Sequence, residues 1–228
     1  MPVRTDIMTC PLCGTTGAIT IYKDESREYR QCSACRLVFV PSNLFLSFEN
    51  EKERYDYHQN SPDDPEYRGF LGRLFAPLLE RLEPGSRGLD FGSGPGPTLS
   101  IMFSEAGFPT EIYDCFYAEA PEAFERIYDF ITASEVVEHM REPCIELDRL
   151  WSILKPGGWL GIMTCLLPAE QLFKEWHYKN DDTHICFFSR PTFEWLATRW
   201  RAEIVFPDRD VVLFRKRMNM KHGGKVSI

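Results

Sequence analysis

The stretch Gly88-Leu89-Asp90-Phe91-Gly92-Ser93-Gly94-Pro95-Gly96 decides the fold of this 228-residue chain. Its first four residues read as a short buried strand, three alternating glycines follow, and residues 97–106 read as a helix closed by Gly107. Glycines allow the backbone to approach a ligand without a Cβ in the way. Ligands of open α/β sheets bind beyond the carboxyl ends of the strands. The stretch therefore predicts a first strand, a ligand-binding loop and a first helix.

The rest of the chain continues this alternation. We expect strands at residues 110–113, 128–133, 159–164, 203–206 and 211–214, and helices at residues 142–154 and 191–200. Strands that alternate with helices indicate an α/β fold with a mostly parallel sheet. Asp114 ends the second strand, where a carboxylate commonly binds ribose hydroxyls.

The glycine spacing separates two classes of cofactor. In the dinucleotide-binding fingerprint the third glycine comes three residues after the second. Here Gly96 follows Gly94 by two residues. A nicotinamide-dependent dehydrogenase is therefore the poorer fit.

Three motifs together resemble those of class I S-adenosylmethionine-dependent methyltransferases. They are residues 89–96, the fourth-strand segment 128–139 with the sequence YDFITASEVVEH, and the turn 154–160 with the sequence LKPGGWL. The resemblance covers about residues 85–215 and implies a Rossmann-like, doubly wound sheet whose last strand is antiparallel. Only 13 residues separate Asp114 from Tyr128. We therefore expect one short helix near residues 118–124 and no strand at the family's third position.

The resemblance also implies roles for individual residues. Asp90 would support the glycine loop, and Asp114 would bind the ribose of S-adenosylmethionine, whose product is S-adenosylhomocysteine. The loop along the cofactor would consist of Gly92, Gly94 and Gly96. The floor near the reacting methyl would consist of Thr132, Ala133 and Ser134. Tyr57, His58 or Asn60 would cover the cofactor. Ordinary packing of a capping helix is the alternative for the last three residues.

The segment 176–189 follows the fifth strand and is dense in polar and aromatic groups. Because imidazole titrates near neutrality, His184 is the candidate general base, with Asp182 orienting it. The alternative is that Asp182 or Thr183 caps the next element and that His184 is a structural histidine. Glu135 and His139 stand four residues apart and are expected to pair on a short helix. We expect no metal there, because no third ligand is in sight.

The cysteines predict a second unit at the N-terminus. Cys10 and Cys13 form one C-x2-C pair and Cys32 and Cys35 another, with 18 residues between the pairs. This spacing is typical of a zinc ribbon, and four cysteine ligands leave no open position, so the zinc would be structural. Four cysteines paired by chance are the alternative. The expected division is a ribbon at 1–45, a helical cap at 46–84, the methyltransferase domain at 85–215 and a basic tail at 216–228.

Composition limits the partners. The net charge is −8, and residues 1–45 hold five basic and four acidic side chains, so a nucleic-acid surface is not favoured. No apolar run approaches the roughly 20 residues that span a bilayer, and no secretory signal is visible, which predicts a cytoplasmic protein. The leading expectation is methylation of a small molecule. The alternatives are an RNA or protein methyltransferase that grips its substrate with the ribbon, and a non-enzymatic, cofactor-sensing scaffold.

Overall fold

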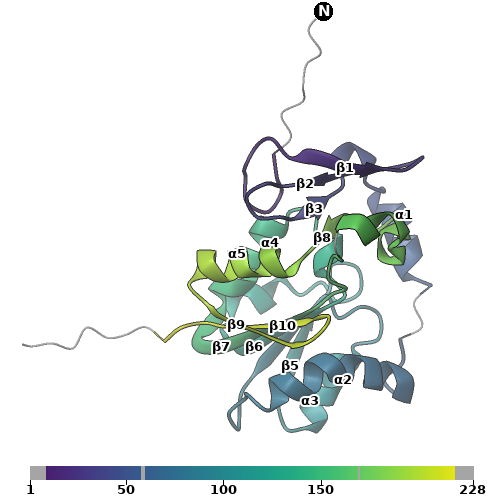
Figure 1. Ribbon diagram of the computed structural model, residues 1–228. Helices are drawn as coiled ribbons and strands as arrows, with labels where there is room; N and C mark the ends of the chain where they lie inside the picture. Colours follow the sequence, from purple (N-terminus) through teal and green to yellow (C-terminus); the bar gives the residue numbers. More distant parts are fainter. Residues whose placement is uncertain (1–8, 58–59, 169, 219–228) are drawn as a thin grey trace, which may run out of the picture.

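The computed structural model describes residues 9–57, 60–168 and 170–218, and its centre is a six-stranded sheet (Figure 1). In spatial order the strands are β5 (Thr110–Tyr113), β4 (Gly88–Phe91), β6 (Tyr128–Ser134), β7 (Leu154–Met163), β10 (Val211–Arg215) and β9 (Glu203–Asp208). Neighbours from β5 to β7 run parallel, and β10 is antiparallel to both β7 and β9. The predicted α/β fold with an antiparallel last strand is confirmed.

The short connection after Asp114 also folds as expected. Between β5 and β6 the described chain forms only a 3-10 helix, η2 (Pro121–Glu125), so β5 is the edge of the sheet. One local expectation was wrong. The Pro-Gly-Gly sequence at residues 156–158 was read as a turn before a strand, but it lies within β7. Tyr128 of β6 pairs with Leu154 of β7, and Phe130 pairs with Trp159, so β7 has five steps where β6 has two. The extra residues of β7, which include the glycines, form an irregularity in the strand pairing.

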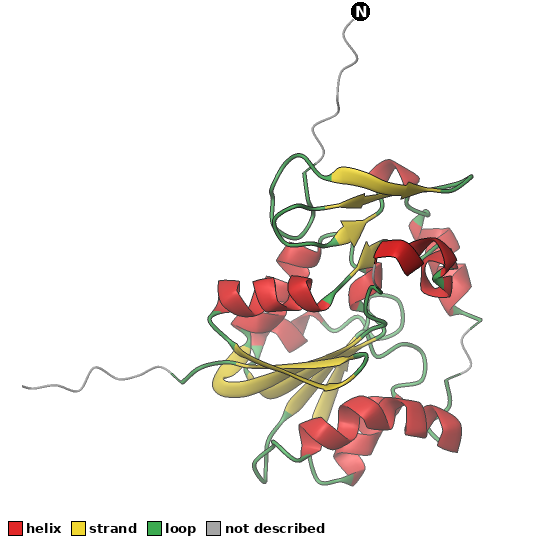
Figure 2. Cartoon of the chain, viewed as in Figure 1, coloured by secondary structure: helices red, strands yellow, loops and turns green. Residues whose placement is uncertain are grey.

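Helices cover both faces of the sheet (Figures 1 and 2). One face carries α2 (Pro65–Leu79) and α3 (Thr98–Glu105), and the other carries α4 (Pro143–Ser152) and α5 (Arg190–Trp200). Helix α2 begins at Pro65, because the Asp64 side chain caps the amides of Glu66 and Tyr67. Helix α1 (Phe48–Tyr55) precedes it.

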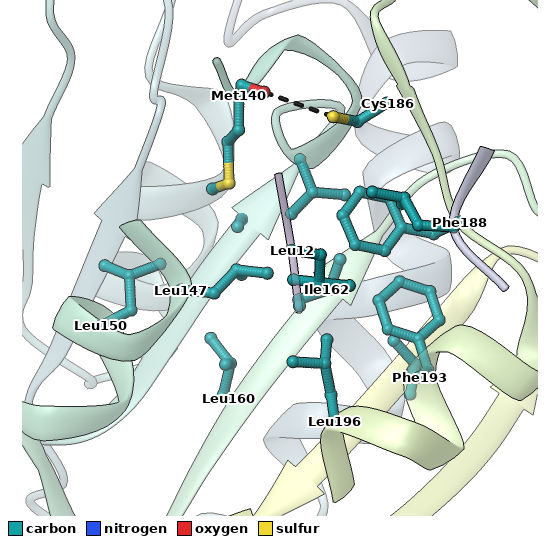
Figure 3. Packing of buried hydrophobic residues seen from close by; sticks show 14 of the residues in the cluster. Leu12, Met140, Leu147, Leu150, Leu160, Ile162, Cys186, Phe188, Phe193 and Leu196 are labelled. Atoms are coloured by element: carbon teal, nitrogen blue, oxygen red, sulfur yellow. Dashed lines mark hydrogen bonds between the residues drawn. The ribbon is translucent and has the colours of Figure 1, made fainter. Parts of the chain in front are cut away.

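Side chains of the central strands alternate between two cores, as a pleated strand requires. In β10, Val211 and Leu213 pack with α2 and α3, whereas Val212 and Phe214 join the core under α4 and α5. That second core extends into the N-terminal unit, since it includes Leu12 from the first cysteine pair (Figure 3).

The N-terminal unit is joined to the larger one by strand pairing. Its strands β1 (Ile19–Lys23), β2 (Glu28–Gln31) and β3 (Val38–Phe39) form a sheet whose fourth member is β8 (Cys186–Phe187). Strands β3 and β8 are antiparallel, with Val38 opposite Phe187. The two units thus share one sheet and one core.

At the other end, residues 219–228 of the expected tail lie outside the described residues, and Lys216 donates to the carbonyls of Trp151 and Leu154. Within the described part of the chain, no helix is both long enough and apolar enough to cross a membrane.

Candidate functional site

The carboxyl ends of β4, β5 and β6 open onto a cavity of about 480 Å³, the position that the strand order predicts. Four segments contribute its walls. They are the glycine loop, the residues after β5, the residues after β6, and a loop before β8 that contains Asp181 and His184. Helices also contribute lining residues, among them Tyr55 of α1, Tyr67 of α2, and Arg149 of the helix Pro143–Ser152.

Two of the three glycines line this cavity. Gly92 and Gly94 have φ angles of 73° and 65°, in the left-handed region that favours glycine. A Cβ on Gly92 would also lie 2.4 Å from the Val136 side chain. Gly96 does not line the cavity; a Cβ there would lie 1.8 Å from the carbonyl oxygen of Asn60. Gly96 therefore does not have the predicted role of lining the cofactor. Its missing Cβ instead allows the backbone of Asn60 to pass close to it.

Asp114 is anchored to the glycine loop. Its Oδ2 accepts a hydrogen bond from the Gly94 amide at 2.8 Å, and its Oδ1 accepts from the amides of Phe116 and Tyr117 at 2.8 and 3.1 Å. The side chain lines the cavity, and an ionised carboxylate has about four acceptor sites. Asp114 can therefore still accept bonds from ligand hydroxyls.

Asp90 and Thr132 lie behind the cavity wall. Thr132 Oγ1 donates to Asp90 Oδ1 at 2.8 Å, which links β6 to β4, and burial raises the pKa of Asp90 to about 7. Thr132 and Ala133 are fully buried and absent from the cavity lining, so only Ser134 of the predicted floor reaches the cavity. This placement agrees with support of the loop by Asp90.

Two serine hydroxyls in the cavity wall point to a polar ligand. The Oγ atoms of Ser93 and Ser134 are buried and have no hydrogen-bond partner among the described residues. Buried polar groups are normally hydrogen-bonded, so a bound molecule with donors or acceptors would satisfy them. The residues present therefore fit a polar cofactor that lies along the glycine loop.

The predicted cover is only partly in place. Asn60 lines the cavity, whereas Tyr57 is 79% exposed and does not. His58 lies outside the described residues. The cover includes aromatic residues that were not assigned to the cofactor from the sequence, above all Tyr55 and Tyr67. Their aromatic side chains and their position in the sequence before the glycine strand were the features from which this role could have been predicted.

Two histidines also line the cavity, His139 and His184, with ring centroids 4.8 Å apart. His184 Nδ1 lies 2.7 Å from the carbonyl oxygen of Tyr178, and His139 Nδ1 lies 3.1 Å from that of Thr183. A carbonyl only accepts, so His184 carries its proton on Nδ1 and presents Nε2 as a base. Burial lowers the pKa of His184 below its usual 6.5, which keeps the ring neutral.

The neighbour of His184 is Asp181 and not the predicted Asp182. Asp181 Oδ2 lies 3.9 Å from His184 Nε2. Asp182 instead lies 3.9 Å from Arg27 and 3.5 Å from Arg54. Asp181 also accepts from the amide and hydroxyl of Thr183, so it is the residue that shapes the turn before His184.

Glu138 lies beside the two histidines and is fully buried. Thr164 donates to its Oε2 at 2.9 Å, the Tyr178 hydroxyl donates to its Oε1, and burial raises its pKa. One ligand atom each from Glu138, His139 and His184 lies within 4.8 Å of the others, so these residues could hold a metal ion. The expectation that no third ligand is near was wrong, because His184 comes from a distant segment.

Glu135 and His139 do not share the short α-helix that was expected. Glu135 has a φ of 53°, and only a three-residue 3-10 helix, η3 (Val137–His139), follows it. The Tyr178 hydroxyl lies 3.2 Å from Glu135 Oε2, and burial raises the pKa of Glu135 to about 8.

The four N-terminal cysteines converge. The Sγ atoms of Cys10 and Cys35 are 3.5 Å apart, those of Cys13 and Cys32 are 3.4 Å apart, and all four lie within 4.8 Å of one another. A tetrahedral zinc with Zn–S bonds of about 2.3 Å requires sulfur atoms roughly 3.8 Å apart. The arrangement of the cysteines fits such an ion.

The comparisons with known proteins agree on one family. A family model described as a methyltransferase domain matches residues 64–202, which is more than half of the chain. A curated relative, the ubiquinone biosynthesis O-methyltransferase of Parvibaculum lavamentivorans, is 32% identical over 96 residues, or 42% of this chain. The match spans only 38% of that relative's length.

Two solved structures from Burkholderia thailandensis are also similar. An O-methyltransferase family protein has a TM-score of 0.51 at 14% identity, over 75% of this chain and 64% of that one. A 1,6-didemethyltoxoflavin-N1-methyltransferase with bound S-adenosylhomocysteine has a TM-score of 0.49 at 16% identity, over 86% of this chain and 98% of that one. At this identity the first likeness supports the fold alone.

Proposed function

We propose that this chain, which belongs to the methyltransferase-domain family, is an S-adenosylmethionine-dependent methyltransferase whose acceptor is a small molecule. One observation carries the proposal. The glycine loop and His184 line the same cavity of about 480 Å³, a size typical of small-molecule sites. The cofactor and its acceptor would lie in this one cavity, covered by side chains of α1 and α2.

The cavity suits the cofactor's charge. Among the described residues its walls contain one cationic side chain apart from the histidines, Arg149, and six carboxyl groups, on Glu51, Asp114, Glu135, Glu138, Glu146 and Asp181. Burial raises the pKa of Glu135, Glu138 and Glu146, so the negative charge rests mainly on the other three. Such a site favours a cationic ligand, and the faces of Tyr55 and Tyr67 can stabilise a sulfonium further. Gly92, Gly94 and Asp114 would hold the ribose and methionine parts, and Ser93 and Ser134 would supply hydrogen bonds.

The proposed mechanism needs little covalent chemistry from the protein. When bound, S-adenosylmethionine supplies an electrophilic methyl group and leaves as S-adenosylhomocysteine after in-line displacement. The cavity aligns the acceptor atom with that methyl and excludes water. His184 Nε2 accepts the proton that the acceptor loses, and Asp181 stabilises the imidazolium that results.

We also propose that Cys10, Cys13, Cys32 and Cys35 hold a structural zinc ion, as cysteine thiolates in a reducing cytoplasm would. The arginines of the ribbon do not favour the alternative that the ribbon binds a nucleic-acid substrate. Arg27 is only 6% exposed and faces the larger unit, and Arg30 is paired with Glu28 at 2.7 Å. These two arginines are therefore not available to phosphates.

Label transfer tests the acceptor class. The purified protein is incubated with methyl-labelled S-adenosylmethionine and cell extract, and label is counted in small-molecule, RNA and protein fractions. We expect label in small molecules, and about threefold to 75-fold less of it with Asp114→Ala as the control at cofactor concentrations near the wild-type dissociation constant. Label in RNA or protein would overturn the small-molecule proposal, and bound cofactor without any label would favour the scaffold.

A further inference from the structure

We infer that the N-terminal ribbon is a positioning element for the acceptor end of the cavity, in which Arg27 and Tyr29 hold the loop that carries His184. This loop, residues 178–185, is called the acceptor loop below. The inference rests on the proposed function, because it assigns the ribbon a role in the same reaction. It would make turnover, but not cofactor binding, depend on the ribbon.

Arg27 makes the central contacts. Its guanidinium donates through Nη1 to the carbonyl oxygen of His184 at 3.1 Å and through Nη2 to the carbonyl oxygen of Lys179. Asp182 Oδ1 lies 3.9 Å from the same Nη2. Because the planar guanidinium presents its donors in a fixed geometry, one buried side chain sets the distance between the two ends of the loop.

Tyr29 supports the same carbonyl from the neighbouring part of the ribbon. Its hydroxyl lies 3.2 Å from the Lys179 oxygen and 3.1 Å from Asp24 Oδ2. The ring is fully buried and packs against Phe173 and Phe187, with centroids 5.1 and 5.9 Å away. The hydroxyl is therefore held in place by packing on the larger unit itself.

The end of the acceptor loop is bound on two sides. Val40 donates from the ribbon to the carbonyl oxygen of Ile185 at 2.9 Å, and the Ile185 amide donates to the carbonyl oxygen of Glu138 at 2.8 Å. Ile185 thus connects the ribbon to the wall that contains Glu138 and His139. The pairing of β3 with β8 continues this contact by two residues.

Inside the acceptor loop, hydrogen bonds join Tyr178 to His184 and Asp181 to Thr183 and His184, so they shape the loop but do not attach it to the rest of the molecule. Between η5 (His177–Asn180) and β8 it forms a turn held by Asp181, with the His184 amide donating to the Asp181 carbonyl at 3.2 Å. The His184 backbone is attached to the rest of the molecule by Arg27 and Val40 from the ribbon, and by Glu138 and His139 from the larger unit. A displacement of about 1 Å at a reacting group can cost on the order of a hundredfold in rate.

Kinetics of Arg27→Ala, Arg27→Lys and the control Arg30→Ala test this inference. Arg30 lies in β2, three residues after Arg27, but pairs with Glu28 inside the ribbon. We expect kcat to fall about tenfold to a hundredfold for Arg27→Ala, with an intermediate value for Arg27→Lys and no change for Arg30→Ala. The dissociation constant of S-adenosylmethionine should stay within about twofold in all three. An unchanged kcat in Arg27→Ala would overturn the inference.

Hydrogen exchange gives a readout that does not need an identified acceptor. With S-adenosylmethionine bound, Arg27→Ala should exchange the amides of residues 183–186 at least tenfold faster than Arg30→Ala, whereas residues 88–114 should be unaffected. Equal protection in the two variants overturns the positioning role even if the acceptor class is right. If Arg27→Ala does not fold, Tyr29→Phe removes one hydroxyl and should show the same pattern with a smaller change; no change in that variant would count against the inference.

Discussion

The two proposed parts of the cavity, the cofactor end at the glycine loop and the acceptor end at His184, are built in different ways. At the cofactor end, Gly92, Gly94 and Asp114 follow two adjacent parallel strands, and a single backbone-to-carboxylate bond connects them. At the acceptor end, Glu138, Asp181 and His184 come from separate loops, and the contacts of the acceptor loop reach back to Arg27 in the ribbon. The first end is a property of the sheet edge, and the second depends on how distant parts of the chain pack.

The comparison therefore predicts that the two ends can be damaged independently. Changes at the acceptor end and in the ribbon should lower turnover and spare cofactor affinity. Changes at the cofactor end should do the reverse.

Replacing the proposed base should give the largest effect on turnover. His184→Ala removes the group that accepts the proton, so we expect kcat to fall about 10²- to 10⁴-fold with unchanged affinity for S-adenosylmethionine. His177→Ala is the matched control, since His177 is an exposed histidine in the segment just before the acceptor loop. Steady-state rates and calorimetry measure the two quantities. An unaltered rate would reduce His184 to a structural residue.

Loss of the ribbon's metal should come next. Cys32→Ser removes one of the four converging thiols, and such small units depend on their metal to fold. We expect loss of zinc by atomic emission and a fall in kcat of about a hundredfold, because the acceptor loop loses its support. Cys144→Ser, outside the cluster, should retain zinc and activity. A parallel loss of cofactor affinity would contradict the independence of the two ends, and full zinc content would contradict the proposed metal site.

The cofactor end should respond to Asp114→Ala. The variant leaves the Gly94, Phe116 and Tyr117 amides without their acceptor, so cofactor binding should weaken by about 1–3 kcal/mol, or roughly 5- to 150-fold. Asp129→Ala, at the opposite ends of the strands, should bind normally. At saturating cofactor the turnover of Asp114→Ala should approach that of the unchanged protein. Equal affinity by calorimetry would remove Asp114 from the site.

The smallest effect concerns pH. A general base works in its neutral form, and burial lowers the pKa of His184 below 6.5 while Glu138 opposes this shift. The acidic limb of kcat should therefore have its midpoint below pH 6.5, and Glu138→Gln should move it lower still. Rates measured from about pH 5 to 8 at saturating substrates test the direction. A midpoint above 6.5 would show that another group titrates.

Much of the fold follows from short stretches of sequence. The strand at residues 88–91, the strand at 110–113 and the absence of a strand between Asp114 and Tyr128 were predicted correctly in the described chain. The convergence of the four cysteines also agreed with their spacing. In each case the physics is local, because glycine stereochemistry, side-chain periodicity and the C-x2-C turn depend on residues that are close in the chain.

The sequence predicted the candidate site only where its residues are close together in the chain. Asp181 rather than Asp182 faces His184, Thr132 turns to Asp90, and Gly96 faces the backbone of Asn60. A one-residue difference at the end of a turn or strand redirects a side chain, and the spacing of polar residues does not encode that direction.

The sequence alone therefore determined the α/β sheet, the glycine loop after its first strand and the cysteine cluster. Only the tertiary structure decided that His139 and His184 meet beside Glu138, and that Arg27 of the ribbon reaches the His184 backbone. These contacts join segments up to 157 residues apart, so they form only when both units share a core. The free energy that stabilises these contacts comes from burying groups that are distant in the chain. No local pattern of residues predicts which distant groups will meet.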